Sequence, residues 1–260
     1  MRKVGIGIIG LGNISAVYLK AAQDFPVLDI RAVADLNPAV AEARAAEFGV
    51  RALPLDAIFT DPSVEIILNL TIPKAHVEVG LRALDAGEHV YSEKPQGVIF
   101  AEGRKLAEAA RAKNLRIGSA PDTFLGGAHQ SARHILDSGR LGQVVGGTTY
   151  FMCPGHERWH PNPAFYYEQG GGPMLDMGPY YITDLVNLLG SVARVAGFGS
   201  MLRASRTITA KERAGEVILV HVPTHVAGTL EFANGALVQL STSFDFCWKR
   251  SRSWPGSEAR

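Results

Sequence analysis

Cysteine is scarce in this sequence: only Cys153 and Cys247 occur among 260 residues. Two thiols so far apart do not make a metal cluster or a disulfide framework, and they fit free thiols in a reducing cytoplasm. The apolar stretch 4–11 near the start is broken by glycines and has no clear small-residue cleavage site, which is not typical of a signal peptide. We therefore expect a soluble, cytoplasmic protein with no membrane partner.

An excess of one charge is also lacking. Lysine and arginine number 26 against 25 aspartates and glutamates, so the net charge is only +1. Nucleic acids and anionic membranes attract strongly basic surfaces, so neither is an expected partner. What the sequence does have is apolar residues, at 47%, and a length that suits two domains of ordinary size.

The first half alternates short apolar runs with helical patterns that stop at glycines. Strands are expected over 4–9, 30–35, 66–71, 89–92 and 115–120. Strands that alternate with helices form right-handed crossovers and a mostly parallel sheet. The sequence therefore predicts an α/β protein whose first domain, 1–120, is a doubly wound parallel sheet.

A glycine turn follows the first of these strands. Gly10 and Gly12 lie between the strand and a helix, and Ser15 stands where a third glycine is common. Glycine lets the backbone approach a phosphate, and the helix N-terminus offers free N–H groups to it. The next strand ends at Asp35, roughly 20 residues further on, where an acid binds both ribose hydroxyls. Together these features predict a dinucleotide site.

Asp35 also favours NAD over NADP as the cofactor. A 2′-phosphate placed ~4 Å from its carboxylate would be repelled by roughly 4 kcal/mol at an effective dielectric constant of 20. The next residues, Leu36, Asn37 and Pro38, supply no arginine that could compensate.

The second half, 121–248, is richer in strands. A helical pattern over 126–138 and a second helix from Pro179 onward accompany strand patterns over 143–151, 192–199, 217–222, 224–232 and 236–246. Asn234-Gly235 between the last two strands is a hairpin signal, because both residues tolerate a positive φ. We expect an α+β domain with a mostly antiparallel sheet.

Several motifs together resemble the Gfo/Idh/MocA oxidoreductases, which include glucose-fructose oxidoreductase and inositol dehydrogenase. They are Gly10-Leu11-Gly12, Asp35, the segment 69–76, Glu93-Lys94-Pro95 and the triple-glycine segment 170–178, and the resemblance covers about 3–245. It implies a Rossmann domain, a substrate and oligomerisation domain, and a nicotinamide enzyme that acts on a sugar, polyol or related hydroxyl compound as a homodimer or homotetramer. Together with the glycine turn and Asp35, the resemblance predicts the following cofactor-binding residues: Gly10, Gly12, Asn13, Ile14, Asp35, Asn69, Thr71, Pro73, His76, Glu93 and Lys94.

Lys94 is the central residue of this interpretation. Pro95 restricts Lys94 to an extended conformation, so its side chain projects from the end of a strand, at the edge where open α/β sheets bind ligands. The resemblance implies that Lys94 lies near the nicotinamide and that Asp176 is an active-site acid. At position 180, where the family often has histidine, this sequence has Tyr180.

The change to tyrosine matters because a free phenol, with a pKa of ~10, is a poor base near neutral pH. A nearby Lys94 ammonium would favour the phenolate. We therefore expect Tyr180 to exchange the substrate hydroxyl proton while Lys94 orients that hydroxyl and Asp176 fixes the substrate or the lysine. Lys94 itself is the alternative proton carrier, and the hydride passes to the nicotinamide.

The segment His156-Glu157-Arg158-Trp159-His160 matches the H-E-x-x-H pattern of zinc peptidases. That pattern binds zinc only on a helix, where residues i and i+4 share a face. Flanking prolines leave too little length for a helix, so a zinc peptidase is a remote alternative and no metal is expected. His156, Trp159 and His160 are instead expected to line the substrate site.

The strand pattern stops after Trp248, and 249–260 has no periodic apolar residues. Family members usually continue with further strands and a closing helix, so the resemblance implies a shortened chain with a disordered tail. Strand 236–246 is then expected to have an unpaired edge. A non-catalytic dinucleotide sensor on the same fold is the alternative function, because a fold does not fix a reaction.

Overall fold

The computed structural model describes residues 2–246, so the predicted tail at 249–260 and Cys247 lie outside the described residues. The chain divides into two compact units. The first comprises Met1–Ala132 with Ile182–Asp184, and the second comprises Arg133–Tyr181 with Leu185–Arg260. The predicted domain limits of 1–120 and 121–248 stay a prediction. Compact units are groups of residues in mutual contact, and they do not show which segment folds independently.

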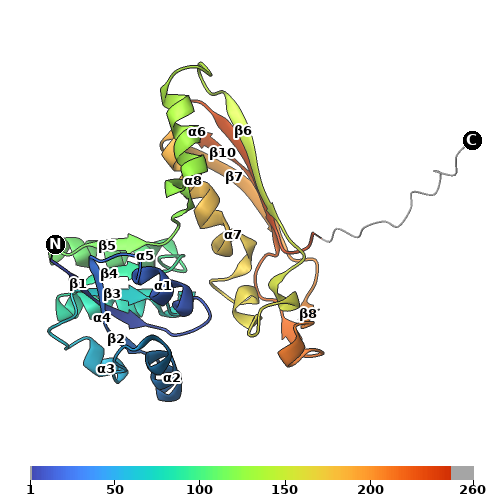
Figure 1. The fold of residues 1–260 in the computed structure, drawn as a ribbon. Helices are drawn as coiled ribbons and strands as arrows, with labels where there is room; N and C mark the ends of the chain where they lie inside the picture. The colour runs from blue at the N-terminus through green and yellow to red at the C-terminus, as the bar shows by residue number, and fades with distance from the viewer. Residues whose placement is uncertain (1, 247–260) are drawn as a thin grey trace, which may run out of the picture. The chain divides into compact units, whose positions relative to one another are not determined.

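The first unit contains a five-stranded parallel sheet in the order β2-β1-β3-β4-β5 (Figure 1). The strands are β1 (Val4–Ile9), β2 (Leu28–Ala34), β3 (Ile66–Asn69), β4 (His89–Ser92) and β5 (Ile117–Ser119). β1, β2 and β3 carry mainly apolar residues, as strands covered on both faces require. The predicted doubly wound parallel sheet is confirmed.

Helices connect these strands: α1 (Ser15–Ala22), α2 (Pro38–Phe48), α3 (Leu55–Ile58), α4 (His76–Ala86) and α5 (Phe100–Ala112). Asn37 caps α2, where its side chain accepts from the N–H of Ala39 at 3.1 Å, and left-handed Gly49 ends the helix. The sequence pattern missed α3, because four residues are too few to show a helical period.

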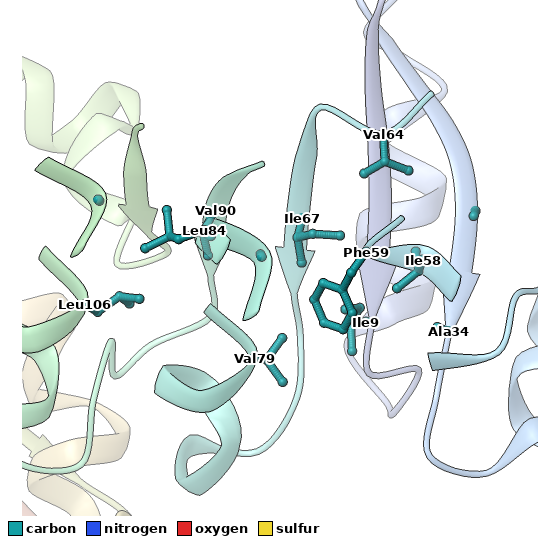
Figure 2. Close-up of a cluster of buried hydrophobic side chains, with 13 residues drawn as sticks. Ile9, Ala34, Ile58, Phe59, Val64, Ile67, Val79, Leu84, Val90 and Leu106 are labelled. Carbon is teal, nitrogen blue, oxygen red and sulfur yellow. The ribbon is translucent and has the colours of Figure 1, made fainter. Parts of the chain in front are cut away.

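Alternate residues of the strands fill two cores, one on each face of the sheet. Ile9, Ala34 and Ile67 belong to the cluster that includes α3, α4 and α5, shown as sticks in Figure 2. Ile8 and Val33, one residue away, belong to the cluster with α1 and α2. Burial on both faces fixes the register of the strands and therefore the place where each strand ends.

The second unit contains a four-stranded sheet in the order β6-β11-β10-β7. Its strands are β6 (Gly146–Met152), β7 (Val192–Ser200), β10 (His225–Phe232) and β11 (Leu237–Ser243). β10 pairs antiparallel with β7 and β11, while β6 pairs parallel with β11. The hairpin at Asn234-Gly235 is confirmed, and Gly235 has φ +90°.

The expectation that the last strand has an unpaired edge is wrong. β11 lies between β10 and β6 and is hydrogen-bonded on both sides. Its second partner, β6, comes from much earlier in the sequence. The edges of this sheet are β6 and β7.

The other elements near this sheet are α6 (Gly127–Asp137), α7 (Gly172–Asp176), α8 (Gly178–Leu189), and the antiparallel pair β8 (Ser205–Thr207) and β9 (Val217–Leu219). The sequence pattern missed α7 and β8, which are five and three residues long. No helix within residues 2–246 combines the length and the apolar character needed to cross a membrane.

Glu88, between α4 and β4, is a buried acid without full hydrogen bonding. It is 6% exposed, and its Oε2 atom has no hydrogen-bond partner within the described part of the chain. Burial, with the negative charge of Asp61, raises the pKa of Glu88 to about 7. Because the folded protein holds this proton more tightly than the unfolded chain, stability from Glu88 is present at low pH and is lost as the pH rises through 7.

The variant Glu88→Gln keeps the shape of the side chain and removes its charge. We expect it to raise Tm at pH 8 by several degrees and to leave Tm at pH 5 nearly unchanged. The buried charge costs on the order of 3 kcal/mol at pH 8, and each kcal/mol shifts Tm by roughly 2–4 °C. Calorimetry at the two pH values is the measurement, with exposed Glu42→Gln as the control; an equal gain at both pH values contradicts this assignment.

Candidate functional site

The turn between β1 and α1 lies against the segment that follows β3. Gly10 has φ +92°, and its N–H donates to the carbonyl oxygen of Ala34 at 3.0 Å. A Cβ on Gly10 would lie 2.7 Å from the carbonyl carbon of Leu70 and from the nitrogen of Thr71. Any side chain at this position would therefore collide with backbone, and only glycine fits.

Gly12, in the same turn, faces open space. A Cβ there would meet no atom within 4 Å. Its carbonyl oxygen accepts from the N–H and the hydroxyl of Ser15, at 3.2 and 2.8 Å. Asn13 and Ile14 are exposed, and no side chain in the described part of the chain caps α1. The open backbone and the first-turn N–H groups of α1 form a surface that suits a phosphate.

Asp35 stands at the end of β2, as predicted. Its Oδ2 accepts from the N–H of Leu11 at 2.8 Å, and its Oδ1 accepts from the N–H of Asn37 at 2.9 Å. A carboxylate has about four acceptor positions, so two neighbouring hydroxyls can still bind. Asp35 thus fixes the glycine turn and retains acceptors for a diol.

Glu93 joins the end of β4 to α1. Its Oε1 accepts from the hydroxyl of Tyr18 at 2.7 Å, and its Oε2 accepts from the N–H of Lys94 at 3.0 Å. Its own N–H donates to the carbonyl oxygen of Asn69 at 2.9 Å. Burial, together with the charge of Glu93, raises the pKa of Tyr18, so the phenol stays a donor. This bond holds the Glu-Lys-Pro segment beside the helix that starts at the glycine turn.

Asn69 and His76 join the loops that follow β3 and β4. Both are fully buried. Asn69 Oδ1 accepts from the hydroxyl of Thr71 at 2.6 Å, and its Nδ2 donates to the carbonyl oxygen of His76 at 3.0 Å. The ring nitrogens of His76 lie 2.6 Å from the carbonyl oxygen of Pro95 and 2.9 Å from that of Thr71. The predicted cofactor residues on these loops thus share one hydrogen-bond network, beside Pro73 at the start of a 3₁₀ turn.

Lys94 follows β4 directly, and the peptide bond between Lys94 and Pro95 is cis. Lys94 belongs to the first unit, whereas Asp176 and Tyr180 belong to the second. The pairing of Lys94 with Tyr180 therefore stays a prediction.

In the second unit, a buried arginine anchors the loop that carries His156. Arg206 Nη1 donates to Glu157 Oε1 at 2.9 Å and to the carbonyl oxygen of Pro154 at 3.2 Å. Its Nη2 donates to the carboxylate of Asp245 and, at 2.9 Å, to the carbonyl oxygen of Phe244. The hydroxyl of Tyr167 donates to Glu157 Oε2, and burial raises the pKa of Tyr167. The loop is therefore tied to β8 and to the end of β11.

This network leaves the zinc alternative without support. His156 lies in a 3₁₀ turn, His156–Arg158, rather than in an α-helix, and Glu157 is the buried partner of Arg206. Within residues 2–246, no group of three or more histidine, cysteine or carboxylate side chains is arranged to hold a metal ion.

His156 makes two hydrogen bonds that define its tautomer. Its Nε2 lies 2.8 Å from Asp176 Oδ2, and its Nδ1 lies 3.2 Å from Trp159 Nε1. An indole N–H only donates, so Nδ1 must be the acceptor. The proton therefore sits on Nε2 and is donated to Asp176. The structure thus brings together two residues predicted for the substrate site and the predicted acid.

Aromatic rings surround this pair. The ring of His156 lies 4.3 Å from that of Tyr166 and 4.7 Å from that of Phe244, and the rings of His160 and Tyr166 are 5.3 Å apart. Burial, with smaller effects of Asp176 and Tyr180, raises the pKa of Tyr166. Asp176, Tyr180 and Tyr166 therefore share one electrostatic environment.

His160, the other predicted histidine, is also buried, and its Nδ1 accepts from the N–H of Asn162 at 3.0 Å. Burial, with a smaller effect of the neighbouring His156, lowers the pKa of His160. This shift favours the neutral form of His160.

Sequence reasoning missed Tyr18, Tyr166 and Arg206. Tyr18 and Tyr166 look like ordinary half-buried tyrosines in the sequence. Arg206 is separated from Glu157 by 49 residues, and it lies in a strand too short to recognise. The tyrosine-rich segment 164–167 next to the H-E-x-x-H pattern was the available signal for Tyr166.

Two family models match almost the whole chain. The model described as "Oxidoreductase family, NAD-binding Rossmann fold" of GFO_IDH_MocA matches residues 4–120, and the model described as "GFO/IDH/MocA C-terminal domain" matches residues 129–254. The two matches together cover both halves of the sequence.

Among curated proteins, dTDP-3,4-didehydro-2,6-dideoxy-alpha-D-glucose 3-reductase of Saccharopolyspora spinosa is 32% identical over 187 residues, which are 69% of this chain and 54% of that protein. Human trans-1,2-dihydrobenzene-1,2-diol dehydrogenase is 30% identical over 180 residues, 68% of this chain and 53% of that protein. The chain spans about half the length of the curated relatives that it matches. A solved levoglucosan dehydrogenase, in complex with NADH and L-sorbose, has a TM-score of 0.82 at 21% identity over 94% of this chain and 68% of its own, which shows a shared fold.

The two turn glycines provide a matched test of the geometry. Gly10→Ala places a methyl group against backbone at positive φ, so we expect it to lower stability by at least about 1–3 kcal/mol. Gly12→Ala adds the same methyl group in open space and should leave Tm unchanged. Thermal unfolding followed by circular dichroism is the measurement, and equal losses in both variants would show that the turn is not packed as described.

Proposed function

Because the chain belongs to the Gfo/Idh/MocA family of oxidoreductases, we propose that it transfers a hydride between NAD and a hydroxyl or carbonyl carbon of a sugar, polyol or related compound. The cofactor supplies the hydride acceptor or donor. The residues of this chain bind and orient the two reactants and move the proton.

The observation that carries this proposal is the glycine turn beside Asp35. Gly10 fixes the turn against the backbone after β3, and Gly12 leaves its outer side open above the uncapped start of α1. The carboxylate of Asp35 accepts from this turn at 2.8 Å, which puts an acceptor for ribose hydroxyls next to a surface for phosphate. Asn13 and Ile14 border the same surface.

NAD is the proposed cofactor, in preference to NADP. If Asp35 binds the ribose, a 2′-phosphate ~4 Å from its carboxylate would be repelled by roughly 4 kcal/mol at an effective dielectric constant of 20. Leu36, Asn37 and Pro38 offer no compensating cation.

For the reaction itself, Lys94 is proposed to orient the substrate hydroxyl and to supply positive charge. Glu93 supports this role, because it holds the backbone of Lys94 and is itself held by Tyr18. Asp176 is proposed to fix the substrate side of the site. Tyr180 and Lys94 are the two proton carriers that the sequence offers.

A sugar or polyol is the proposed substrate, and His156, Trp159 and His160 are proposed to contact it. Trp159 supports this assignment, because 57% of it is exposed although its N–H is bound to His156. A fixed, exposed indole is an apolar surface with a polar edge, which suits a ring that carries both C–H and O–H groups. Sugar and diol compounds also appear in the names of the curated relatives.

We further propose a cytoplasmic homodimer or homotetramer that assembles through the second sheet. The register places Tyr150, Phe198 and Leu237 on one face of that sheet, and they are 66%, 89% and 53% exposed. A hollow of about 450 Å³ lies over the same four strands. Exposed apolar faces of this kind mark protein interfaces.

Turnover is tested by incubation with NAD and a panel of sugars and polyols while the absorbance of reduced nicotinamide is followed. We expect at least one compound to be oxidised, and we expect Lys94→Ala to lower kcat/KM by more than about 100-fold. Lys105→Ala, an exposed lysine on α5, is the matched control and should behave as the parent protein. Cofactor binding without turnover of any compound would favour the non-catalytic sensor instead.

Cofactor choice is tested by Asp35→Ser. The parent protein should bind NAD at least tenfold more tightly than NADP, because the carboxylate repels the 2′-phosphate. The variant should bind NAD more weakly and bring the two dissociation constants close together in isothermal titration calorimetry. Tighter binding of NADP by the parent protein would contradict the assignment of Asp35.

A further inference from the structure

Tyr18 connects the two motifs of the first unit that carry the proposed function. It lies in α1, and its N–H donates to the carbonyl oxygen of Ile14 at 3.5 Å, so its backbone belongs to the start of that helix. Its side chain reaches the end of β4, where the hydroxyl donates to Glu93 Oε1 at 2.7 Å. A residue at the helix start that suits a phosphate thus holds the acid that precedes Lys94.

The two carboxylate oxygens of Glu93 have different partners. Oε1 accepts from Tyr18, and Oε2 accepts from the N–H of Lys94 at 3.0 Å. Because a carboxylate is planar and rigid, a hydrogen bond at one oxygen restricts the place of the other oxygen. Without the phenol, the side chain of Glu93 would regain rotamer freedom, and Oε2 would no longer be held against Lys94.

The backbone on either side of Lys94 is anchored by other groups. The N–H of Glu93 donates to the carbonyl oxygen of Asn69 at 2.9 Å, and the carbonyl oxygen of Pro95 lies 2.6 Å from Nδ1 of buried His76. These contacts fix the path of the chain. The bond from Glu93 Oε2 is made to the N–H of Lys94 itself, so it fixes the peptide plane from which the Lys94 side chain departs.

The surroundings of Tyr18 keep its hydroxyl a donor. Burial, followed by the charge of Glu93 and smaller effects of Tyr91 and Asp122, raises the pKa of Tyr18. A phenol donates to a carboxylate only while it is protonated. The bond from Tyr18 to Glu93 is therefore maintained at neutral and moderately alkaline pH.

We propose that Tyr18 is a positioning residue for the reaction, which acts through Glu93 to hold Lys94 in the orientation that the reaction requires. This inference rests on the proposed role of Lys94 and adds to it a residue outside the sequence motifs. All three residues belong to the first unit. The phenol itself takes no part in the chemical step, and its effect reaches the step only through the carboxylate of Glu93.

Tyr18→Phe keeps the ring and removes the hydroxyl. We expect kcat at saturating NAD and substrate to fall by about tenfold or more, as for the loss of a hydrogen bond to a charged group. The dissociation constant of NAD should change by less than about twofold, because the backbone of the glycine turn is untouched. A structural role alone would instead lower Tm and weaken NAD binding without a specific loss of kcat.

Tyr91→Phe is the matched control for this variant. Tyr91 lies on β4, two residues before Glu93, and its hydroxyl is not part of the bonds that join Tyr18, Glu93 and Lys94. The control variant should have the kcat of the parent protein. An equal loss of kcat in both variants would contradict a specific role of Tyr18.

A double-mutant cycle identifies the route by which Tyr18 acts. If the route runs through Glu93, Tyr18→Phe should have no further effect on kcat in a protein that already carries Glu93→Ala. Two losses that multiply would show that Tyr18 acts by another route, and they would overturn the proposal.

Lys94 can also be observed without turnover. After reductive methylation of the lysines with isotopically labelled formaldehyde, the NMR signal of Lys94 is assigned by its absence from Lys94→Arg. This signal should shift in Tyr18→Phe and stay in place in Tyr91→Phe. An active protein in which Tyr18→Phe retains both kcat and the Lys94 signal overturns this inference alone. A parent protein that binds NAD but turns over no compound overturns the proposed function, and an unshifted Lys94 signal then rejects the link from Tyr18 as well.

Discussion

The second unit depends on the buried guanidinium group of Arg206. Arg206 is 4% exposed, and its donors hold the loop at Pro154 and Glu157 together with the end of β11 at Phe244 and Asp245. A buried charge of this kind is tolerated only while its partners remain, and loss of one partner typically costs about 3–5 kcal/mol. The position of His156, and with it the contacts to Asp176 and Trp159, follows from this ion pair. Arg206 thus sets the geometry of the loop that carries His156, Trp159 and His160.

The first unit is constrained by contact between backbones. Gly10 lies so close to Leu70 and Thr71 that the glycine turn and the loop after β3 form one packed layer. The hydrogen bonds of Glu93 extend that layer to β4 and α1, and those of His76 extend it to the loop at Pro95. The glycine turn, Asp35 and the Glu-Lys-Pro segment are therefore joined by contacts along one edge of the sheet.

Much of this edge could be predicted from the sequence, because its signals are local. Gly10, Gly12 and Asp35 follow strands whose apolar runs are plain, and Asn37, Gly49 and Gly87 mark helix ends by their own conformations. The second unit was harder to predict from the sequence, because its main contacts join residues that are far apart in the chain. His156 meets Asp176 across 20 residues, Glu157 meets Arg206 across 49, and β8 has only three residues. Hydrophobic periodicity carries no information on such pairs.

The parallel pairing of β6 with β11 has a consequence for how the chain acquires its structure. Three of the four strand pairs in the first sheet join residues 23 to 27 positions apart, and β1 pairs with β3 across 60 residues, so this sheet can assemble before the second one. Gly146 can pair with Leu237 only after about 90 further residues have been made. Contacts between residues so far apart in the sequence form slowly. Until then β6 has no partner strand in its sheet. Synthesis of the second unit therefore includes an interval in which an edge strand is exposed to chaperones and to other nascent chains.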